Sequence, residues 1–327
     1  MDIKAQAADF QKRYAAILAE IGKIIVGHEP IIRGVVTGIV AGGHVLLEGA
    51  PGLGKTLLVR TLSHILRVKF SRIQFTPDLM PADITGTNIV VEDEHGSKRF
   101  EFQKGPVFAN ILLADEINRA TPKTQSALLE CMEERHVTVS GQTHPLPAPF
   151  FVMATQNPIE MEGTYPLPEA QMDRFFFKLK LSASDQGELS EIINRTTGAA
   201  AATPQAVATG EDIIAMRDLS REVPIASHVK EYVARVVLAT QPDRAEAPPL
   251  AKKYVRYGAS PRAAQALVLG AKVLALSKGR YNVSFEDVRE IACPAMRHRL
   301  ILNFEGEAED VDPDRIIAEI LGKIPEM

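Results

Sequence analysis

Hydrophobic positions recur with helical spacing at both ends of the chain and in short blocks between them. An amphipathic stretch over residues 10–25 places Tyr14, Ile17 and Ile21 on one face of a predicted helix. Short runs rich in Val, Leu, Ile and Phe follow at residues 44–47, 69–75, 110–114, 150–155 and 174–181, and each is typical of a buried strand. Because helical periodicity fills segments between the early runs, we expect a parallel sheet with helices on both faces.

The pattern changes near residue 182. Residues 198–210 are small and polar, which predicts a flexible link. Beyond them the pattern is helical throughout, and helix starts are indicated by the capping residues Ser260, Ser284 and Asp312. We therefore predict an α/β domain over residues 1–185, a link over 186–210 and a helical domain over 211–327.

Composition and charge exclude several classes of protein. Hydrophobic residues make up 46% of the chain, which is enough for a sizeable core. The 41 acidic residues exceed the 37 basic ones, so the net charge of −4 argues against a nucleic-acid partner, and residues 297–299 are interpreted as a solvated basic face. No apolar run reaches the length of a membrane span, and the opening residues lack an export-signal pattern, so we expect a cytoplasmic protein.

The strongest local motif is Gly49-Ala-Pro-Gly-Leu-Gly-Lys-Thr56, between a predicted strand and a predicted helix. G-x-x-x-x-G-K-T in that context predicts a phosphate-binding loop, whose backbone N–H groups and helix N-terminus face the phosphates. We expect Lys55 to reach the β- and γ-phosphates and Thr56 to place its hydroxyl on Mg²⁺. The predicted nucleotide-binding residues of this segment are Gly49, Ala50, Pro51, Gly52, Leu53, Gly54, Lys55, Thr56 and Leu57.

Polar residues end two further predicted strands. The run 111–114 is followed by Asp115 and Glu116, and the run 150–155 leads to Asn157. We expect Asp115 to hold Mg²⁺ through water, and Glu116 to orient and deprotonate the attacking water. Asn157 is expected to lie between the γ-phosphate and that water, because ligands of such sheets collect at the carboxyl ends of the strands. The predicted cofactors are ATP and Mg²⁺, and the predicted reaction is hydrolysis.

These motifs, in this order and before a helical bundle, resemble the AAA+ ATPases. Residues 105–120, Gly-Pro-Val-Phe-Ala-Asn-Ile-Leu-Leu-Ala-Asp-Glu-Ile-Asn-Arg-Ala, and residues 169–175, Glu-Ala-Gln-Met-Asp-Arg-Phe, are similar to the MoxR family in the helix-2-insert clade. The resemblance implies a P-loop AAA+ αβα sandwich with a five-stranded parallel sheet and a C-terminal all-α lid domain. A β-rich run at residues 87–91, a turn and an alternating run at 98–103 predict a hairpin at about residues 85–104, which resembles the clade's helix-2 insert. A second hairpin is predicted at about residues 135–146.

The resemblance also assigns residues outside the phosphate loop. Val26 and Gly27 match the segment that packs the adenine, followed by His28 where many relatives have Gln. Arg174 matches the arginine finger that reaches the γ-phosphate bound by the neighbouring subunit, and Arg262 matches the arginine that the helical domain presents to the nucleotide. The family usually forms hexamers, so we expect a homo-oligomeric ring.

The function implied is an ATP-hydrolysing MoxR-type ring that acts as a chaperone-like remodeller in the assembly, maturation or metal and cofactor insertion of partner proteins. Its family often works with proteins that carry a von Willebrand factor A domain. The alternatives are a magnesium-chelatase-like motor subunit and a nucleotide-gated scaffold, and a nucleic-acid motor is disfavoured by the acidic balance. The client, the partner contacts of the hairpins and the role of Arg119 stay open.

Overall fold

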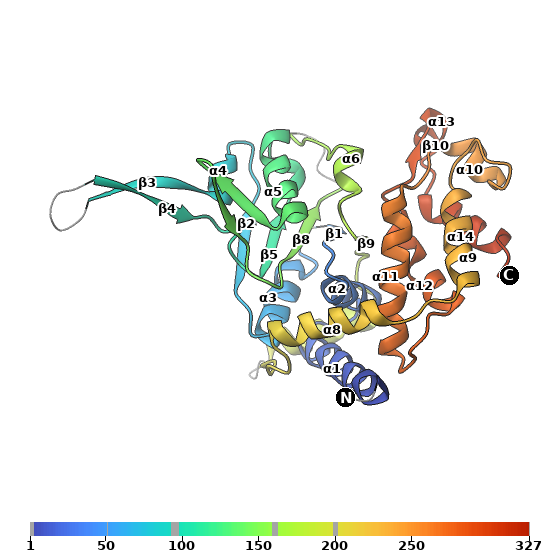
Figure 1. Ribbon diagram of the computed structural model, residues 1–327, viewed down its shortest axis with the longest axis horizontal. Coiled ribbons are helices and arrows are strands. Elements are labelled where there is room, and N and C mark those ends of the chain that lie inside the picture. Colours follow the sequence, from blue (N-terminus) through green and yellow to red (C-terminus); the bar gives the residue numbers. More distant parts are fainter. Residues whose placement is uncertain (1–2, 51, 93–97, 159–162, 199–201, 327) are drawn as a thin grey trace.

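The fold is an α/β domain joined to a helical one, as Figure 1 shows. The computed structural model describes residues 3–50, 52–92, 98–158, 163–198 and 202–326. Its main sheet has five parallel strands in the order β2-β5-β8-β1-β9. These strands are β1 (Val45–Glu48), β2 (Phe70–Gln74), β5 (Ile111–Asp115), β8 (Phe151–Gln156) and β9 (Phe177–Lys180). The predicted five-stranded parallel sheet is confirmed.

Alternate residues of each central strand pack into two separate cores. In β1, Val45 and Leu47 belong to one hydrophobic cluster, and Leu46 belongs to the other. The two-residue period of a strand produces this division, because successive side chains point to opposite faces of the sheet. Two details differ from the sequence prediction. The strand β2 lies at the sheet edge, and of its residues only Ile73 is buried, while β9 begins at Phe177 and leaves Arg174 in the preceding turn.

Helices cover both faces of the sheet. The predicted N-terminal helix is α1 (Ile3–Ile24), which contacts α2 (Glu29–Ala41) and α3 (Lys55–Ile65) on one side of the molecule. The other side holds α4 (Pro81–Thr85), the short 3₁₀ helix η1 (Ile117–Arg119), α5 (Pro122–Glu134) and α6 (Glu169–Met172). The arrangement is the αβα sandwich that the resemblance implied.

Both predicted hairpins are present. The first pairs β3 (Gly86–Glu92) with β4 (Lys98–Lys104) as a long antiparallel arm that projects from the sandwich in Figure 1. The second pairs β6 (His136–Val139) with β7 (Gln142–Pro145). Asn88 Nδ2 of the first hairpin donates to Ser140 Oγ in the turn of the second over 3.0 Å, and Phe102 stacks on His144 with ring centroids 4.1 Å apart. The two inserts therefore contact each other.

The segment predicted as a flexible link is ordered wherever the structure describes it. Residues 186–197 form α7 (Gln186–Thr197), which begins with a capping box at Asp185. Farther along, the backbone N–H groups of Val207 and Ala208 both donate to Ile65 O at the end of α3. The segment predicted as a link therefore includes a helix at 186–197, and two of its later residues are hydrogen-bonded to the α/β domain.

The C-terminal part is mostly helical, as predicted. It contains α8 (Gly210–Glu222), α9 (Ser227–Leu238), α10 (Pro249–Tyr254), α11 (Pro261–Ser277), α12 (Phe285–Met296), α13 (Phe304–Ala308) and α14 (Pro313–Lys323). Ser260, Ser284 and Asp312 each accept a hydrogen bond from a backbone N–H of the helix they begin, which confirms the three predicted starts. A short antiparallel pair, β10 (Val255–Tyr257) with β11 (Ile301–Leu302), was not expected in an all-α lid.

One hydrophobic cluster runs from α1, α2 and the sheet into α9, α11, α12 and α14. The two parts of the chain therefore share a core. Among the described residues, no helix combines the length and apolar character needed to cross a bilayer.

Candidate active site

The phosphate loop bends as its glycines allow. Gly52 and Gly54 have φ angles of 84° and 74°, in the left-handed region that favours glycine, and Gly54 precedes the first residue of α3. Lys55 Nζ donates to Gly49 O over 2.7 Å, so the ammonium lies against the beginning of the loop. Burial lowers the pKa of Lys55, and the nearby carboxylates of Asp115 and Glu116 oppose this effect. The loop therefore holds a fixed cation at the N-terminus of a helix.

A cavity of about 410 Å³ opens beside this loop, and we call it the phosphate cavity. Its lining residues are Gly52, Leu53, Gly54, Lys55, Thr56, Leu57, Arg72, Gln74, Asp115, Glu116 and Asn157. The structure thus brings the loop, the acid pair and Asn157 together at the carboxyl ends of β1, β5 and β8, as the sequence predicted. Among the other predicted residues, Gly49 precedes this lining and Pro51 falls outside the described residues.

The predicted adenine segment lies apart from the phosphate cavity. Val26 and Gly27 are absent from its lining, and Gly27 lies against the carboxylate end of the Glu188 side chain of α7. His28 adopts a left-handed backbone at the start of α2. In this conformation the Glu188 carboxylate covers Gly27.

Asp115, the last residue of β5, has both carboxylate oxygens engaged. Thr155 Oγ1 donates to its Oδ1 over 2.6 Å, and Arg72 Nη2 lies 2.7 Å from its Oδ2. Asp115 and Thr56 both line the phosphate cavity, and oxygen donors of this kind suit Mg²⁺, which takes one or two carboxylates together with phosphate and water. Within the described ranges, no group of three or more His, Cys, Asp or Glu is placed so that it could hold a metal ion.

Glu116 follows in a left-handed conformation, with a φ angle of 55°. Its backbone N–H donates to Thr155 Oγ1 over 2.8 Å. Its Oε2 accepts a hydrogen bond from Gln74 Nε2 over 2.7 Å and lies 2.9 Å from Arg119 Nη1. The carboxylate predicted to activate water is thus held through Oε2 by a residue of the neighbouring strand and by Arg119 in the following 3₁₀ turn.

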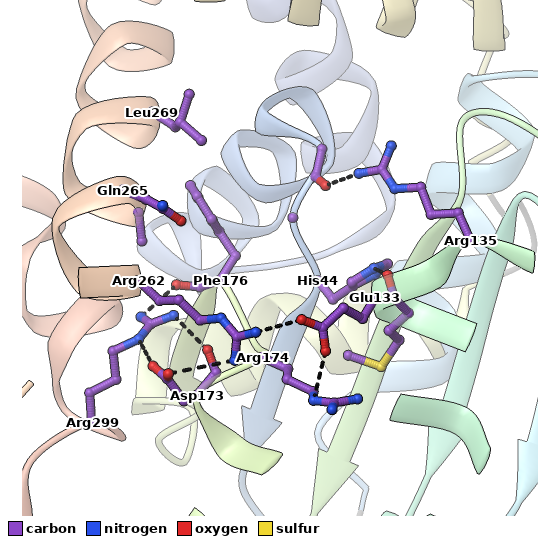
Figure 2. Close-up of a pocket in the computed structure, with 14 residues that line it drawn as sticks. His44, Glu133, Arg135, Asp173, Arg174, Phe176, Arg262, Gln265, Leu269 and Arg299 are labelled. Carbon is purple, nitrogen blue, oxygen red and sulfur yellow. Dashed lines mark hydrogen bonds and ion pairs between the residues drawn. The ribbon is translucent and has the colours of Figure 1, made fainter. Parts of the chain in front are cut away.

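A second cavity, of about 220 Å³, collects the two arginines that the resemblance singled out (Figure 2). We call it the arginine cavity, lined by Gly42, Gly43, His44, Met132, Glu133, Arg135, Asp173, Arg174, Phe176, Arg262, Gln265, Ala266, Leu269 and Arg299. Arg174 Nε lies 3.0 Å from Glu133 Oε2, and Arg262 Nη2 pairs with Glu133 Oε1. One carboxylate therefore binds an arginine from each part of the chain.

A buried ion pair lies behind this bridge. Arg299 Nε donates to Asp173 Oδ1 over 2.7 Å, and the Arg299 side chain is only 3% exposed. Its other N–H groups donate to backbone oxygens, among them Phe175 O and Phe176 O. The interpretation of residues 297–299 as a solvated face is wrong, because Asp173 and these carbonyls compensate the guanidinium inside the protein.

The two cavities lie at opposite ends of the sheet and share no lining residue. The phosphate cavity follows the carboxyl ends of the strands, whereas Gly43 and Arg174 precede the amino ends of β1 and β9. The four residues of β1 alone separate these ends by about 13 Å. Arg262 lies beside Arg174 and does not line the phosphate cavity of its own chain. This position was not predicted from the sequence.

Comparison with known proteins shows where this arrangement belongs. The family described as "ATPase family associated with various cellular activities (AAA)" matches residues 44–177, and the "AAA lid domain" matches residues 249–320. The chain is 45% identical to the chaperone MoxR1 of Mycobacterium tuberculosis over 92% of this chain and 79% of that protein. The chain belongs to the MoxR family of AAA+ ATPases.

Other MoxR relatives match over nearly their whole length. The chain is 40% identical to the YeaC protein of Bacillus subtilis over 98% of this chain and 97% of that protein, and 30% identical to the MoxR protein of Paracoccus denitrificans over 95% and 96%. A crystal structure of a Cytophaga hutchinsonii protein is 41% identical, with a TM-score of 0.91 over 98% of this chain and 97% of that one. The family models, the relatives and the solved structure therefore agree on an AAA-type ATPase fold, and the named relatives identify the MoxR family.

Several residues of this MoxR-family site escaped sequence reasoning. Arg72 and Gln74 come from the edge strand β2, which carries no motif, and they reach the acid pair only because β2 pairs in register with β5. Glu133 lies within an ordinary acidic turn of α5, and no local signal distinguishes it from Glu130 or Glu134. These residues are found only once the strands and helices are placed.

Proposed function

We propose that this chain hydrolyses ATP at a site shared between two copies of itself in a homo-oligomeric ring. The observation that carries the proposal is the separation of the phosphate cavity from the arginine cavity at opposite ends of one sheet. Arg174 and Arg262 line the arginine cavity and not the phosphate cavity of their own chain. A head-to-tail contact, repeated around a closed ring, brings the arginine cavity of one copy to the phosphate cavity of the next.

The residues have separate roles in this site. The loop N–H groups and Lys55 would bind the phosphates, and Thr56 and Asp115 would hold Mg²⁺, which would supply positive charge next to the phosphate oxygens. Glu116, freed from its present partners, accepts a proton from water that Asn157 orients. The cations of the neighbouring copy, Arg174 and Arg262, stabilise the charge that spreads over the transferred group.

The ring uses this hydrolysis to remodel partner proteins, in the manner of a chaperone that works in the cytoplasm on the assembly, maturation or cofactor loading of its clients. The β3–β4 hairpin supports a partner-binding role. Val90 and Phe100 face each other across this arm, and they are 58% and 78% exposed. Such a protruding apolar pair is suited to contact another protein, with a von Willebrand factor A domain protein as the expected adaptor.

Glu116→Gln tests the hydrolytic part directly. The amide cannot take the proton from water, so we expect ATP binding to persist while the turnover number falls about 10²–10⁴-fold. Binding is measured with a fluorescent nucleotide and turnover by phosphate release, with Lys55→Ala as the control that loses binding as well. Normal steady-state turnover in Glu116→Gln would remove this carboxylate from the mechanism.

The same variant identifies the client. A ring trapped with ATP by Glu116→Gln is captured from cells, and the retained proteins are compared with those held by Lys55→Ala. Retention of a von Willebrand factor A domain protein and a further protein by the trapped ring alone supports remodelling. Equal retention by both variants would contradict nucleotide-dependent client binding.

A further inference from the structure

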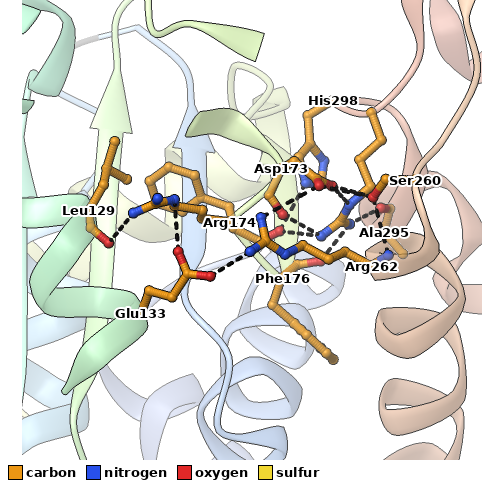
Figure 3. Close-up of polar contacts among 11 residues, drawn as sticks. Leu129, Glu133, Asp173, Arg174, Phe176, Ser260, Arg262, Ala295 and His298 are labelled. Atoms are coloured by element: carbon orange, nitrogen blue, oxygen red, sulfur yellow. Dashed lines mark hydrogen bonds and ion pairs between the residues drawn. The ribbon is translucent and has the colours of Figure 1, made fainter. Parts of the chain in front are cut away.

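The bridge between Arg174 and Arg262 is built from three separate elements (Figure 3). Glu133 belongs to α5, Arg174 follows α6 in the α/β domain, and Arg262 lies in the first turn of α11 in the lid. Each oxygen of the Glu133 carboxylate takes one guanidinium group. Arg174 Nη1 also donates to Leu129 O, one turn earlier on α5, over 3.0 Å. Glu133 of α5 therefore contacts both arginines, while Arg262 Nη1 also lies 3.7 Å from Asp173 Oδ2.

The end of α5 that carries Glu133 is itself fixed on both sides. The buried His44 ring donates from Nε2 to Met132 O over 3.0 Å, and its Nδ1 accepts the backbone N–H of Val152 over 2.9 Å. Burial lowers the pKa of His44 to about 4, so the ring is neutral and keeps this donor–acceptor arrangement near pH 7. On the other side, Arg135 Nη2 donates to Gly42 O over 2.9 Å. The end of α5 that carries the Glu133 carboxylate is thus tied to Gly42 and His44, which directly precede β1.

The exposure of the bridge argues that it does little for folding. The side chains of Glu133, Arg174 and Arg262 are 38%, 33% and 42% exposed. Ion pairs this open to water add little to stability, in contrast to the buried pair of Asp173 and Arg299. The bridge instead fixes the positions of the two guanidinium groups, because these groups would repel each other without a shared anion between them.

We propose that Glu133 is the positioning residue that holds Arg174 and Arg262 together as one unit for the nucleotide of the neighbouring copy. The inference rests on the proposed shared site and deepens it. Glu133 makes no contact with the nucleotide and acts only through the two arginines. Because Arg174 comes from the α/β domain and Arg262 from the lid, the bridge also ensures that both domains present their cations at one place.

The test is Glu133→Gln, which keeps the shape of the side chain and removes its charge, with Glu130→Gln on the same helix as the matched control. We expect Glu133→Gln to lower the turnover number about 10²-fold, the cost of a small misplacement of catalytic groups, and to leave the KM for ATP within about twofold. The KM for ATP should stay nearly unchanged because the substitution does not alter the phosphate loop. Glu130→Gln is expected to match the unsubstituted protein.

Epistasis separates positioning from a general structural effect. Added to the Arg174→Ala, Arg262→Ala double variant, Glu133→Gln should cause no further loss of turnover, because the groups it positions are gone. Ring assembly and thermal midpoint are measured in parallel. Should Glu133→Gln fail to fold, Glu133→Asp is taken through the same assays, since its shorter carboxylate cannot bind both arginines in the same places and should also lower turnover.

Three results would overturn the inference. These are unchanged turnover in Glu133→Gln, an equal loss in Glu130→Gln, and a further loss in the arginine-free background. If Arg174→Ala is itself fully active, the shared site fails together with this inference. If Arg174→Ala is inactive and Glu133→Gln is fully active, the shared site stands and only the positioning role of Glu133 is excluded.

Discussion

The phosphate cavity and the arginine cavity differ in how their charges are compensated. In the phosphate cavity, two carboxylates at strand ends are paired within the chain, Asp115 with Arg72 and Glu116 with Arg119. In the arginine cavity, Glu133 is shared between Arg174 and Arg262, so cations are in excess. In the proposed shared site, the phosphate cavity would supply the loop and the carboxylates, and the arginine cavity would supply the cations that phosphoryl transfer requires.

Removing the finger cation should produce the largest effect. Arg174→Ala leaves the phosphate cavity intact but withdraws the charge that stabilises the transition state, so we expect turnover to fall about 10³–10⁵-fold with nucleotide affinity unchanged. Phosphate release and nucleotide titration measure the two quantities. Arg195→Ala, which removes an exposed arginine of α7, is the matched control, and equal activity in both variants would break the contrast between the cavities.

The buried pair behind the bridge should matter for folding. Asp173→Asn leaves Arg299 without its carboxylate, and removing one partner of a buried pair costs about 3–5 kcal/mol of unfolding free energy. Urea unfolding measures this loss, and Glu133→Gln, at the exposed mouth of the same cavity, should cost only about 0–1 kcal/mol. Similar losses of unfolding free energy in the two variants would show that the buried pair and the exposed bridge do not differ in their contribution to folding.

The smallest expected effect concerns Mg²⁺. Arg72 pairs with Asp115 Oδ2 and is 46% exposed, so its positive charge competes with a metal held near the same carboxylate. In Arg72→Met we expect the Mg²⁺ concentration for half-maximal nucleotide binding to fall by about fivefold, which corresponds to roughly 1 kcal/mol for an exposed pair. Titration of Mg²⁺ at fixed nucleotide measures it. A higher Mg²⁺ requirement would mean that Arg72 helps to hold the nucleotide instead.

The phosphate cavity could be predicted from the sequence because its parts are local. The loop between a strand and a helix, the acids after β5 and Asn157 after β8 each carry their own signal, and parallel pairing brings strand ends together. The arginine cavity depends on contacts between distant residues, such as Arg262 with Glu133, which are 129 positions apart. The resemblance identified its arginines, but neither composition nor periodicity indicated Glu133 or the burial of Arg299.

The hydrogen bonds of the segment between the domains could not be predicted from the sequence for a related reason. A small and polar composition predicted flexibility, yet Gln205 N donates to Glu20 Oε2 and Val207 N donates to Ile65 O. Those partners lie far back in the chain. Amino-acid composition does not predict which backbone groups form hydrogen bonds with distant residues, so these contacts are found only once the fold is known.

Mixing two inactive variants tests most directly whether one site is made by two copies. Arg174→Ala subunits keep the phosphate cavity and Glu116→Gln subunits keep the arginine cavity, so a mixed ring contains contacts in which both halves are intact. We predict that phosphate release, absent from either variant alone, appears on mixing and depends on the ratio of the two. Mixed rings that assemble normally and stay inactive at every ratio would contradict a site shared between neighbours.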